Sequence, residues 1–209
     1  MARPNLDLIS DASGPNSFCR PISNIHKFYL SGELKSPDEY VAWFEEIRTA
    51  PEGDIIYLHI NCPGGDAFSA IQFLRALYET KATTIASVEG ACMSAATMLF
   101  MAAQHHEITS HSVFMFHDFS TMAVGKGGEV FDQVIHQKGW GEGLLRDIYK
   151  HFLTEKDIAL ILTGKDVYMR PEEVADRLRI RDKKTKRVIK VAPVTPEKTV
   201  KVKKISKLK

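Results

Sequence analysis

The sequence predicts an α/β fold in which a parallel β-sheet is flanked by connecting helices. Short runs of branched and aromatic residues alternate along the chain with longer runs that have apolar residues at helical spacing. This alternation favours parallel strands, because a crossover helix returns the chain to the same edge of the sheet. The composition agrees: 209 residues, 44% hydrophobic and 26% charged, are typical of one globular domain with a sizeable core.

Three strand–helix units are predicted in the first half of the chain. The first helix has a clear start, since Ser36 can cap it, Pro37 suits the first helical position and Glu39 completes a capping box. The second strand stops at a Pro-Gly-Gly turn. In chain order the predicted elements are a strand at 27–31, a helix at 37–47, a strand at 54–61, a helix at 66–80, a strand at 83–88 and a helix at 94–103.

The second half of the chain is predicted to be mostly helical. A strand at 112–116 is followed by a flexible, glycine-rich segment at 125–128. The long helical stretch at 129–152 is expected to be interrupted near Gly139 and Gly141, because glycine is a poor helix former. Two short helices complete the prediction, at 155–162 and at 171–178.

One folded domain is expected at 25–182, between an irregular arm at 1–24 and a basic tail at 183–209. The tail holds eleven Lys and Arg residues against one acid, Glu197, so the other 182 residues carry 17 basic and 25 acidic side chains, a net charge of −8. A basic tail can attract nucleic acid through its charge. It lacks interleaved aromatic residues and the chain shows no nucleic-acid-binding motif, so we expect a solvated, partly disordered tail and no nucleic-acid partner.

Cysteine and hydropathy patterns indicate a cytoplasmic protein. Cys19, Cys62 and Cys92 are odd in number and lack CxxC spacing, which predicts reduced thiols. No apolar signal segment is visible at the N-terminus, and the longest mostly apolar stretch, 91–103, is too short to span a bilayer. We expect no metal site, because no standard zinc spacing is matched by the neighbouring histidines His105, His106, His111 and His117.

Ser94 is a candidate nucleophile because it stands between a predicted strand and a predicted helix. The free N–H groups and the dipole of a helix N-terminus favour the negative charge that forms beside a nucleophile during acyl transfer. The motif alone fits a simpler interpretation better, since serine is a favoured helix N-cap. Cys62 and Cys92 are rival nucleophiles, although a cysteine among small residues is more often a buried apolar side chain.

Two further junctions carry candidate residues. The loop at 61–65 contains Gly64 and Gly65, whose bare backbone suits an oxyanion-hole donor, a substrate-clamping loop or a plain tight turn; no phosphate-binding motif is present. His117 immediately follows the predicted strand at 112–116 and is well placed to act as a general base. Asp118 would project away from it, whereas Asp166, in a loop between two predicted helices, is a candidate to orient the imidazole.

Five motifs in one order resemble the family of the proteolytic subunit of the Clp protease, ClpP. They are Y-L-S-G at 29–32, I-N-C-P-G-G at 60–65, G-A-C-M-S-A-A-T at 90–97, M-F-H at 115–117 and K-D-V-Y-M-R-P-E-E-V at 165–174. The resemblance covers about residues 25–180. It implies the ClpP/crotonase-like fold and a serine endopeptidase with Ser94 as nucleophile, His117 as base and Asp166 as acid. The oxyanion-hole positions are then Gly65 and Ala95.

The resemblance also implies how a substrate is bound and delivered. The segment 121–128 matches a glycine-rich strand that pairs with an extended polypeptide, which gives Gly125, Gly127 and Gly128, together with Gly64, a substrate-binding role. The helix at 129–152 matches a protruding handle, about 121–152 overall, through which two rings dock. The family forms a heptameric ring, single or doubled, and receives unfolded polypeptide from a separate AAA+ unfoldase. The unfoldase uses the ATP, so no cofactor is expected in this chain.

The sequence departs from the family in three places. A-C-M-S-A-A-T stands where the family has A-A-S-M-G and is closer to bacteriophage versions, Lys165 replaces the arginine before the acid, and 177–182 replaces the family's G-L-I/V-D. Placing the nucleophile at Cys92 would shorten its distance from Gly90 and break the match, which favours Ser94.

Three other functions stay open at this point. A phage capsid or scaffold maturation protease would share the fold, as would a catalytically silent ring subunit. A crotonase-type acyl-CoA enzyme would share the fold and oxyanion hole, but it does not need the Ser–His–Asp order.

Overall fold

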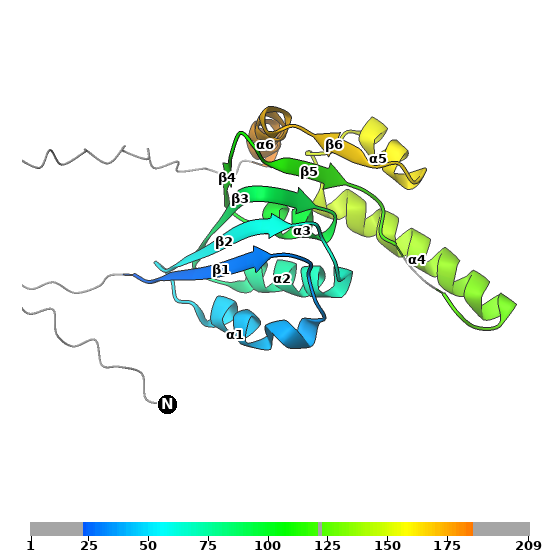
Figure 1. Ribbon diagram of the computed structural model, residues 1–209, viewed down its shortest axis with the longest axis horizontal. Helices are drawn as coiled ribbons and strands as arrows, with labels where there is room; N and C mark the ends of the chain where they lie inside the picture. Colours follow the sequence, from blue (N-terminus) through cyan, green and yellow to red (C-terminus); the bar gives the residue numbers. More distant parts are fainter. Residues whose placement is uncertain (1–22, 121–122, 186–209) are drawn as a thin grey trace, which may run out of the picture.

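The computed structural model describes residues 23–120 and 123–185, which form one six-stranded sheet with helices packed around it (Figure 1). The strands are β1 (Ile25–Ser31), β2 (Ile55–Cys62), β3 (Thr83–Met93), β4 (His105–Ile108), β5 (Val113–Phe116) and β6 (Val167–Met169). The helices are η1 (Pro37–Tyr40), α1 (Val41–Thr49), α2 (Ala67–Glu79), α3 (Ala95–Ala102), α4 (Gly127–Ile148), α5 (Glu155–Leu162) and α6 (Pro171–Thr185). The predicted α/β class is confirmed.

The sheet is mainly parallel. Its order is β1-β2-β3-β5-β6, and β4 pairs with β3 beside β5. All neighbours run parallel except β5 and β6, which are antiparallel. The carboxyl ends of β1, β2, β3 and β5 therefore share one edge of the sheet, where the arrowheads meet in Figure 1. In α/β proteins this is the edge where sites form.

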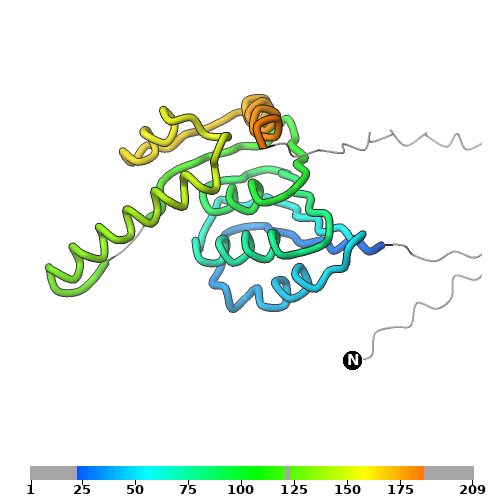
Figure 2. The backbone as a smooth tube through the Cα atoms, turned by 180° about the vertical axis from the view of Figure 1, so that it is seen from behind, coloured from blue at the N-terminus to red at the C-terminus, as the bar shows by residue number. Residues whose placement is uncertain are grey.

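One face of the sheet packs against helices α1 to α3, which lie side by side in Figure 2. Alternate residues of the strands are buried, including Phe28, Leu58 and Val88, as the two-residue period of a strand requires. The Phe28 ring lies 5.2 Å from that of Trp43 in α1. Burying each such side chain stabilises the fold by ~1.5–3 kcal/mol. Helix α4 leaves this body and projects outward (Figure 2).

Two short strands were not predicted. β4 and β6 have four and three residues, too few to show a periodic pattern. Each exists because a longer neighbour is already in place: β4 pairs with the first part of β3, and β6 pairs with β5. The loop that was expected to hold Asp166 thus runs directly into β6.

Helix α4 corrects two predictions. It is continuous past Gly139 and Gly141, because Phe119 packs where a side chain of residue 141 would stand, and this packing offsets the low helix propensity of glycine. It also begins at Gly127, so Gly127 and Gly128 are helical and residues 123–126 form no strand. Lys126 is extended and Glu129 lies in the first turn, an arrangement that favours a helix start. The expected glycine-rich strand is therefore wrong in its described part; 121–122 lie outside it.

Helix α6 runs past its predicted end at 178 to Thr185. Arg181 and Asp182 are buried, and the Arg181 guanidinium donates to the Met101 carbonyl oxygen at the end of α3 (3.4 Å). These contacts carry the helix through the expected domain end at 182. The domain boundaries stay predictions, since the arm up to residue 22, with Cys19, and the tail from 186 lie outside the described residues. No helix in the described part has the length and hydrophobicity to cross a membrane.

Candidate active site

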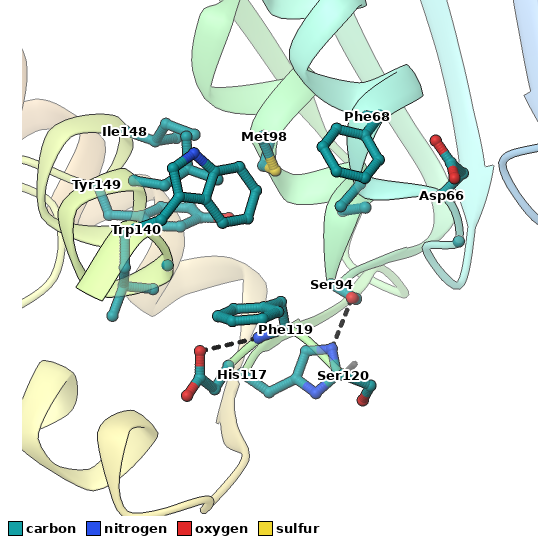
Figure 3. Close-up of a pocket in the computed structure, with 17 residues that line it drawn as sticks. Asp66, Phe68, Ser94, Met98, His117, Phe119, Ser120, Trp140, Ile148 and Tyr149 are labelled. Atoms are coloured by element: carbon teal, nitrogen blue, oxygen red, sulfur yellow. Dashed lines mark hydrogen bonds between the residues drawn. The ribbon is translucent and has the colours of Figure 1, made fainter. Parts of the chain in front are cut away.

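Ser94 lies in a strained turn between β3 and α3. Its φ of 52° and ψ of −128° are rarely adopted by residues other than glycine and cost ~1–3 kcal/mol. Its side chain makes no capping hydrogen bond to α3; instead, Oγ lies 2.6 Å from Nε2 of His117 (Figure 3). The interpretation of Ser94 as a plain helix cap is therefore wrong. The strained turn places the hydroxyl beside an imidazole.

The β3–β5 pairing brings His117 to Ser94. Met93 is the register partner of Met115, and the N–H of Ser94 donates to the Met115 carbonyl oxygen at 2.9 Å. His117 follows two residues later, at the carboxyl end of β5. The contact between hydroxyl and imidazole thus rests on strand pairing deep in the sheet.

The β5–β6 pairing brings Asp166 to the far side of the same imidazole. Phe116 is opposite Val167, so the antiparallel register continues to His117 and Asp166. Nδ1 of His117 lies 3.8 Å from Oδ1 of Asp166, within ion-pair range but beyond hydrogen-bond length. The Asp166 side chain is 46% exposed. The carboxylate of Asp118, which we expected to project away from His117, accepts the N–H of Phe119 at 2.9 Å.

The loop after β2 places Gly64 and Gly65 against the serine turn. Both have positive φ, 111° and 136°. A Cβ on Gly64 would lie 2.6 Å from Cβ of Ser94, and one on Gly65 would overlap the backbone of Leu34. Two hydrogen bonds to Leu34 fix the loop. The N–H of Leu34 donates to the Gly64 carbonyl oxygen (2.7 Å), and the N–H of Asp66 donates to the Leu34 carbonyl oxygen (3.0 Å). Only glycine allows this close approach.

Two residues whose backbone N–H groups are candidate oxyanion donors, Gly65 and Ala95, line the cavity beside Ser94. Ala95 is the first residue of α3, so its N–H has no acceptor within the helix. Gly65 lines the same cavity from the opposite loop. The N–H of Ser94 itself is engaged by Met115. Gly65 and Ala95, the pair that the family resemblance implies, thus line the same cavity as Ser94.

The cavity has a volume of about 360 Å³ and a wall that is more apolar than polar. Trp140 of α4 is central to it: its ring centroid lies 6.0 Å from that of Phe68 and 5.7 Å from that of Phe119. In Figure 3, Phe68 and Trp140 face one another above Ser94. The larger apolar lining residues include Phe68, Met98, Phe119, Trp140, Leu144 and Ile148.

The sequence interpretation missed this wall. Trp140, Leu144 and Ile148 repeat every four residues and so share one face of α4. This periodicity is visible in the sequence, but it does not identify the element against which this face of α4 packs. Phe68 lies in the predicted helix at 66–80, but nothing in that pattern indicates that it is 66% exposed and lines the cavity.

The rival nucleophiles are not suited to the role. Cys62 and Cys92 are both buried, and burial raises the pKa of each thiol, that of Cys92 well above its ordinary value. A buried, protonated thiol is a poor nucleophile. The two cysteines are register partners in β2 and β3 but are not joined.

Metal-ligating side chains do not gather in the described part of the chain, where no group of three His, Cys, Asp or Glu residues could hold an ion. His105 and His106 lie on β4, and a ring nitrogen of His106 is 2.9 Å from the Phe100 carbonyl oxygen.

A family model described as Clp protease matches residues 44–176 of the chain. The match spans most of the sheet and includes Ser94, His117 and Asp166. A comparison with curated proteins found no match.

Proposed function

The chain belongs to the Clp protease family, a family of ClpP-type peptidases, and on this premise we propose that it is a serine endopeptidase with Ser94 as nucleophile. The observation that carries the proposal is the 2.6 Å contact between Ser94 Oγ and His117 Nε2 at a strained turn. A nucleophile within hydrogen-bond reach of a base is the arrangement that activates a hydroxyl.

The reaction follows from this geometry. Nε2 of His117 takes the hydroxyl proton as Oγ of Ser94 attacks the scissile carbonyl carbon. The N–H groups of Gly65 and Ala95 stabilise the oxyanion that forms. When the C–N bond breaks, His117 gives its proton to the leaving amine, and a water molecule then releases the acyl group by the same steps. Asp166 stabilises the imidazolium and holds its orientation.

We place this chemistry on unfolded polypeptide inside a ring of identical subunits. The family resemblance suggests a heptameric ring, single or doubled, and a separate AAA+ unfoldase that uses ATP. Exposed apolar residues on α4 support its use as a docking surface between subunits; they are Phe131, Val134 and Ile135. Native mass spectrometry tests the ring: a particle of seven or fourteen chains supports it, and a monomer at working concentration contradicts it.

Substitution of Ser94 by alanine tests the assignment. Ser94→Ala should abolish hydrolysis of a short fluorogenic peptide while the particle stays assembled, because the attacking atom is gone. Cys92→Ala is the matched control, two residues away, and should keep the activity. Undiminished hydrolysis by Ser94→Ala would refute the proposal. The contact between Ser94 and His117 also favours an active enzyme over a catalytically silent subunit.

A further inference from the structure

A buried chain of hydroxyl groups runs from the end of α4 to the backbone of Ser94. Oγ1 of Thr97 lies 2.6 Å from the Ser94 carbonyl oxygen and 2.6 Å from the hydroxyl oxygen of Tyr149. The N–H of Thr97 also donates to the Ser94 carbonyl oxygen, at 2.9 Å. Thr97 is fully buried and Tyr149 is 6% exposed.

The donor in each of these hydrogen bonds follows by elimination. A carbonyl oxygen can only accept, so the single hydroxyl proton of Thr97 is donated to Ser94. The Tyr149 hydroxyl must therefore donate to Oγ1 of Thr97. Burial raises the pKa of Tyr149, which keeps the phenol protonated and able to donate. Two donors from one residue thus hold the Ser94 carbonyl oxygen, and a third group supports the side-chain donor.

The Ser94 carbonyl group and the Ala95 N–H belong to one peptide plane. A peptide unit is rigid, so fixing the oxygen also fixes the direction of the N–H on its other side. This matters at Ser94 because its φ and ψ are strained, and strained backbone persists only where its surroundings hold it. The hydrogen bonds of Thr97 supply that support.

Tyr149 also touches the strand that carries the base. Its ring lies 5.5 Å from the ring of Phe116 in an edge-to-face contact, and Phe116 precedes His117. Helix α4, for which Tyr149 is the C-cap residue, also provides Trp140 to the cavity wall. Tyr149 thus connects three parts of the site: the turn at Ser94, strand β5 before His117, and helix α4.

We propose that Thr97 and Tyr149 are positioning residues that aim the Ala95 N–H at the oxyanion of the reaction. The inference rests on the proposed peptidase function and extends it. Thr97 acts through the Ser94–Ala95 peptide, and Tyr149, which also lines the cavity, acts through Thr97.

The test compares Thr97→Val, which keeps the shape and removes the hydroxyl, with Thr97→Ser, which keeps the hydroxyl. Thr97→Val should lower kcat for a short fluorogenic peptide about 5- to 10-fold, the worth of one hydrogen bond, with KM unchanged. Thr97→Ser should stay close to wild type. Affinity for a peptide boronic acid, which mimics the tetrahedral state, should fall in step with kcat, whereas affinity for the cleaved product peptide should not.

The variant Tyr149→Phe tests whether Tyr149 belongs to the same series of hydrogen bonds as Thr97. Alone it should lower kcat about 2- to 5-fold, and in the Thr97→Val background it should add nothing, because the group through which it acts is gone. If Thr97→Val fails to fold, Tyr149→Phe and its boronic-acid affinity decide the question in its place.

Three results would overturn the inference: wild-type kcat in Thr97→Val, equal losses in boronic-acid and product affinity, or multiplying effects in the double variant. The first leaves the peptidase proposal intact as long as Ser94→Ala is inactive. Activity in Ser94→Ala removes the proposed function itself, so the two failures are distinguishable.

Discussion

The two ends of the parallel sheet differ in how their backbone and polar groups are arranged. The carboxyl end carries Ser94 and Gly65 in strained or positive-φ conformations, packed against other backbone. The amino end carries a satisfied network in which His26 Nε2 lies 2.9 Å from Oδ2 of Asp54, and Asp54 Oδ1 accepts the N–H of Asn24 at 2.8 Å. Of these two ends, the carboxyl end, where we place the chemistry, carries the strained serine, whereas satisfied hydrogen bonds hold the amino end.

A pair of glycine substitutions separates the two ends most strongly. Gly64→Ala should reduce kcat/KM at least about 100-fold, because its Cβ would displace Ser94 and misplace the nucleophile. Gly53, at the amino end, also has positive φ, 99°, but open space around it. Gly53→Ala should cost about 1–2 kcal/mol in the free energy of unfolding and leave hydrolysis unchanged. Equal activity losses in the two variants would contradict the contrast.

Removing the charge of Asp166 should have a smaller effect at the carboxyl end. Asp166→Asn should lower kcat roughly 10- to 100-fold, less than for a buried, hydrogen-bonded triad acid, because water can reach this exposed carboxylate. The matched control is Asp176→Asn on α6, an exposed ion-pair partner of Arg179 that should be silent. A wild-type rate in Asp166→Asn would show that His117 is oriented by other groups.

Truncating the cavity wall tests substrate binding rather than chemistry. Trp140→Ala should raise KM about tenfold for peptides with a large apolar side chain before the cleaved bond, with little change for small ones. Tyr78→Ala, an exposed aromatic on α2 outside the cavity, is the control. A uniform loss for all peptides, or none, would mean that the cavity does not select side chains.

The amino-end network should give a pH-dependent stability and no catalytic effect. The hydrogen bond with Asp54 raises the pKa of His26, so its contribution is complete below about pH 6.5 and is lost as pH rises through the raised value. The same bond lowers the pKa of Asp54, so its contribution is complete above about pH 3.8 and is lost on further acidification. The difference in urea midpoint between wild type and His26→Gln should therefore peak between about pH 4 and 6.5. A difference that grows toward pH 9 would have the wrong sign.

Much of the candidate site could be predicted because its parts stand at strand ends. Ser94, His117 and Gly65 each follow a strand that is visible as an apolar run, and parallel strands bring their carboxyl ends together. The geometry itself could not be predicted. Serine is a favoured N-cap, and only a histidine 23 residues away shows that Ser94 serves another purpose.

The unpredicted parts all depend on contacts between distant elements. β6 needs β5 beside it, the continuity of α4 needs Phe119 over Gly141, and the role of Thr97 needs Tyr149. Each of these residues has a local pattern that fits an ordinary loop, break or core position. These features depend on packing between distant segments, and the sequence of one segment does not reveal such packing.

Covalent labelling tests the central claim most directly. A fluorophosphonate should form one adduct per chain, and mass spectrometry of the digested protein should place it on Ser94, because that hydroxyl is paired with His117 at the cavity. Prior incubation with a peptide boronic acid should prevent the labelling. An adduct on another residue, or no adduct on the folded protein, would contradict the assignment of Ser94 as the nucleophile.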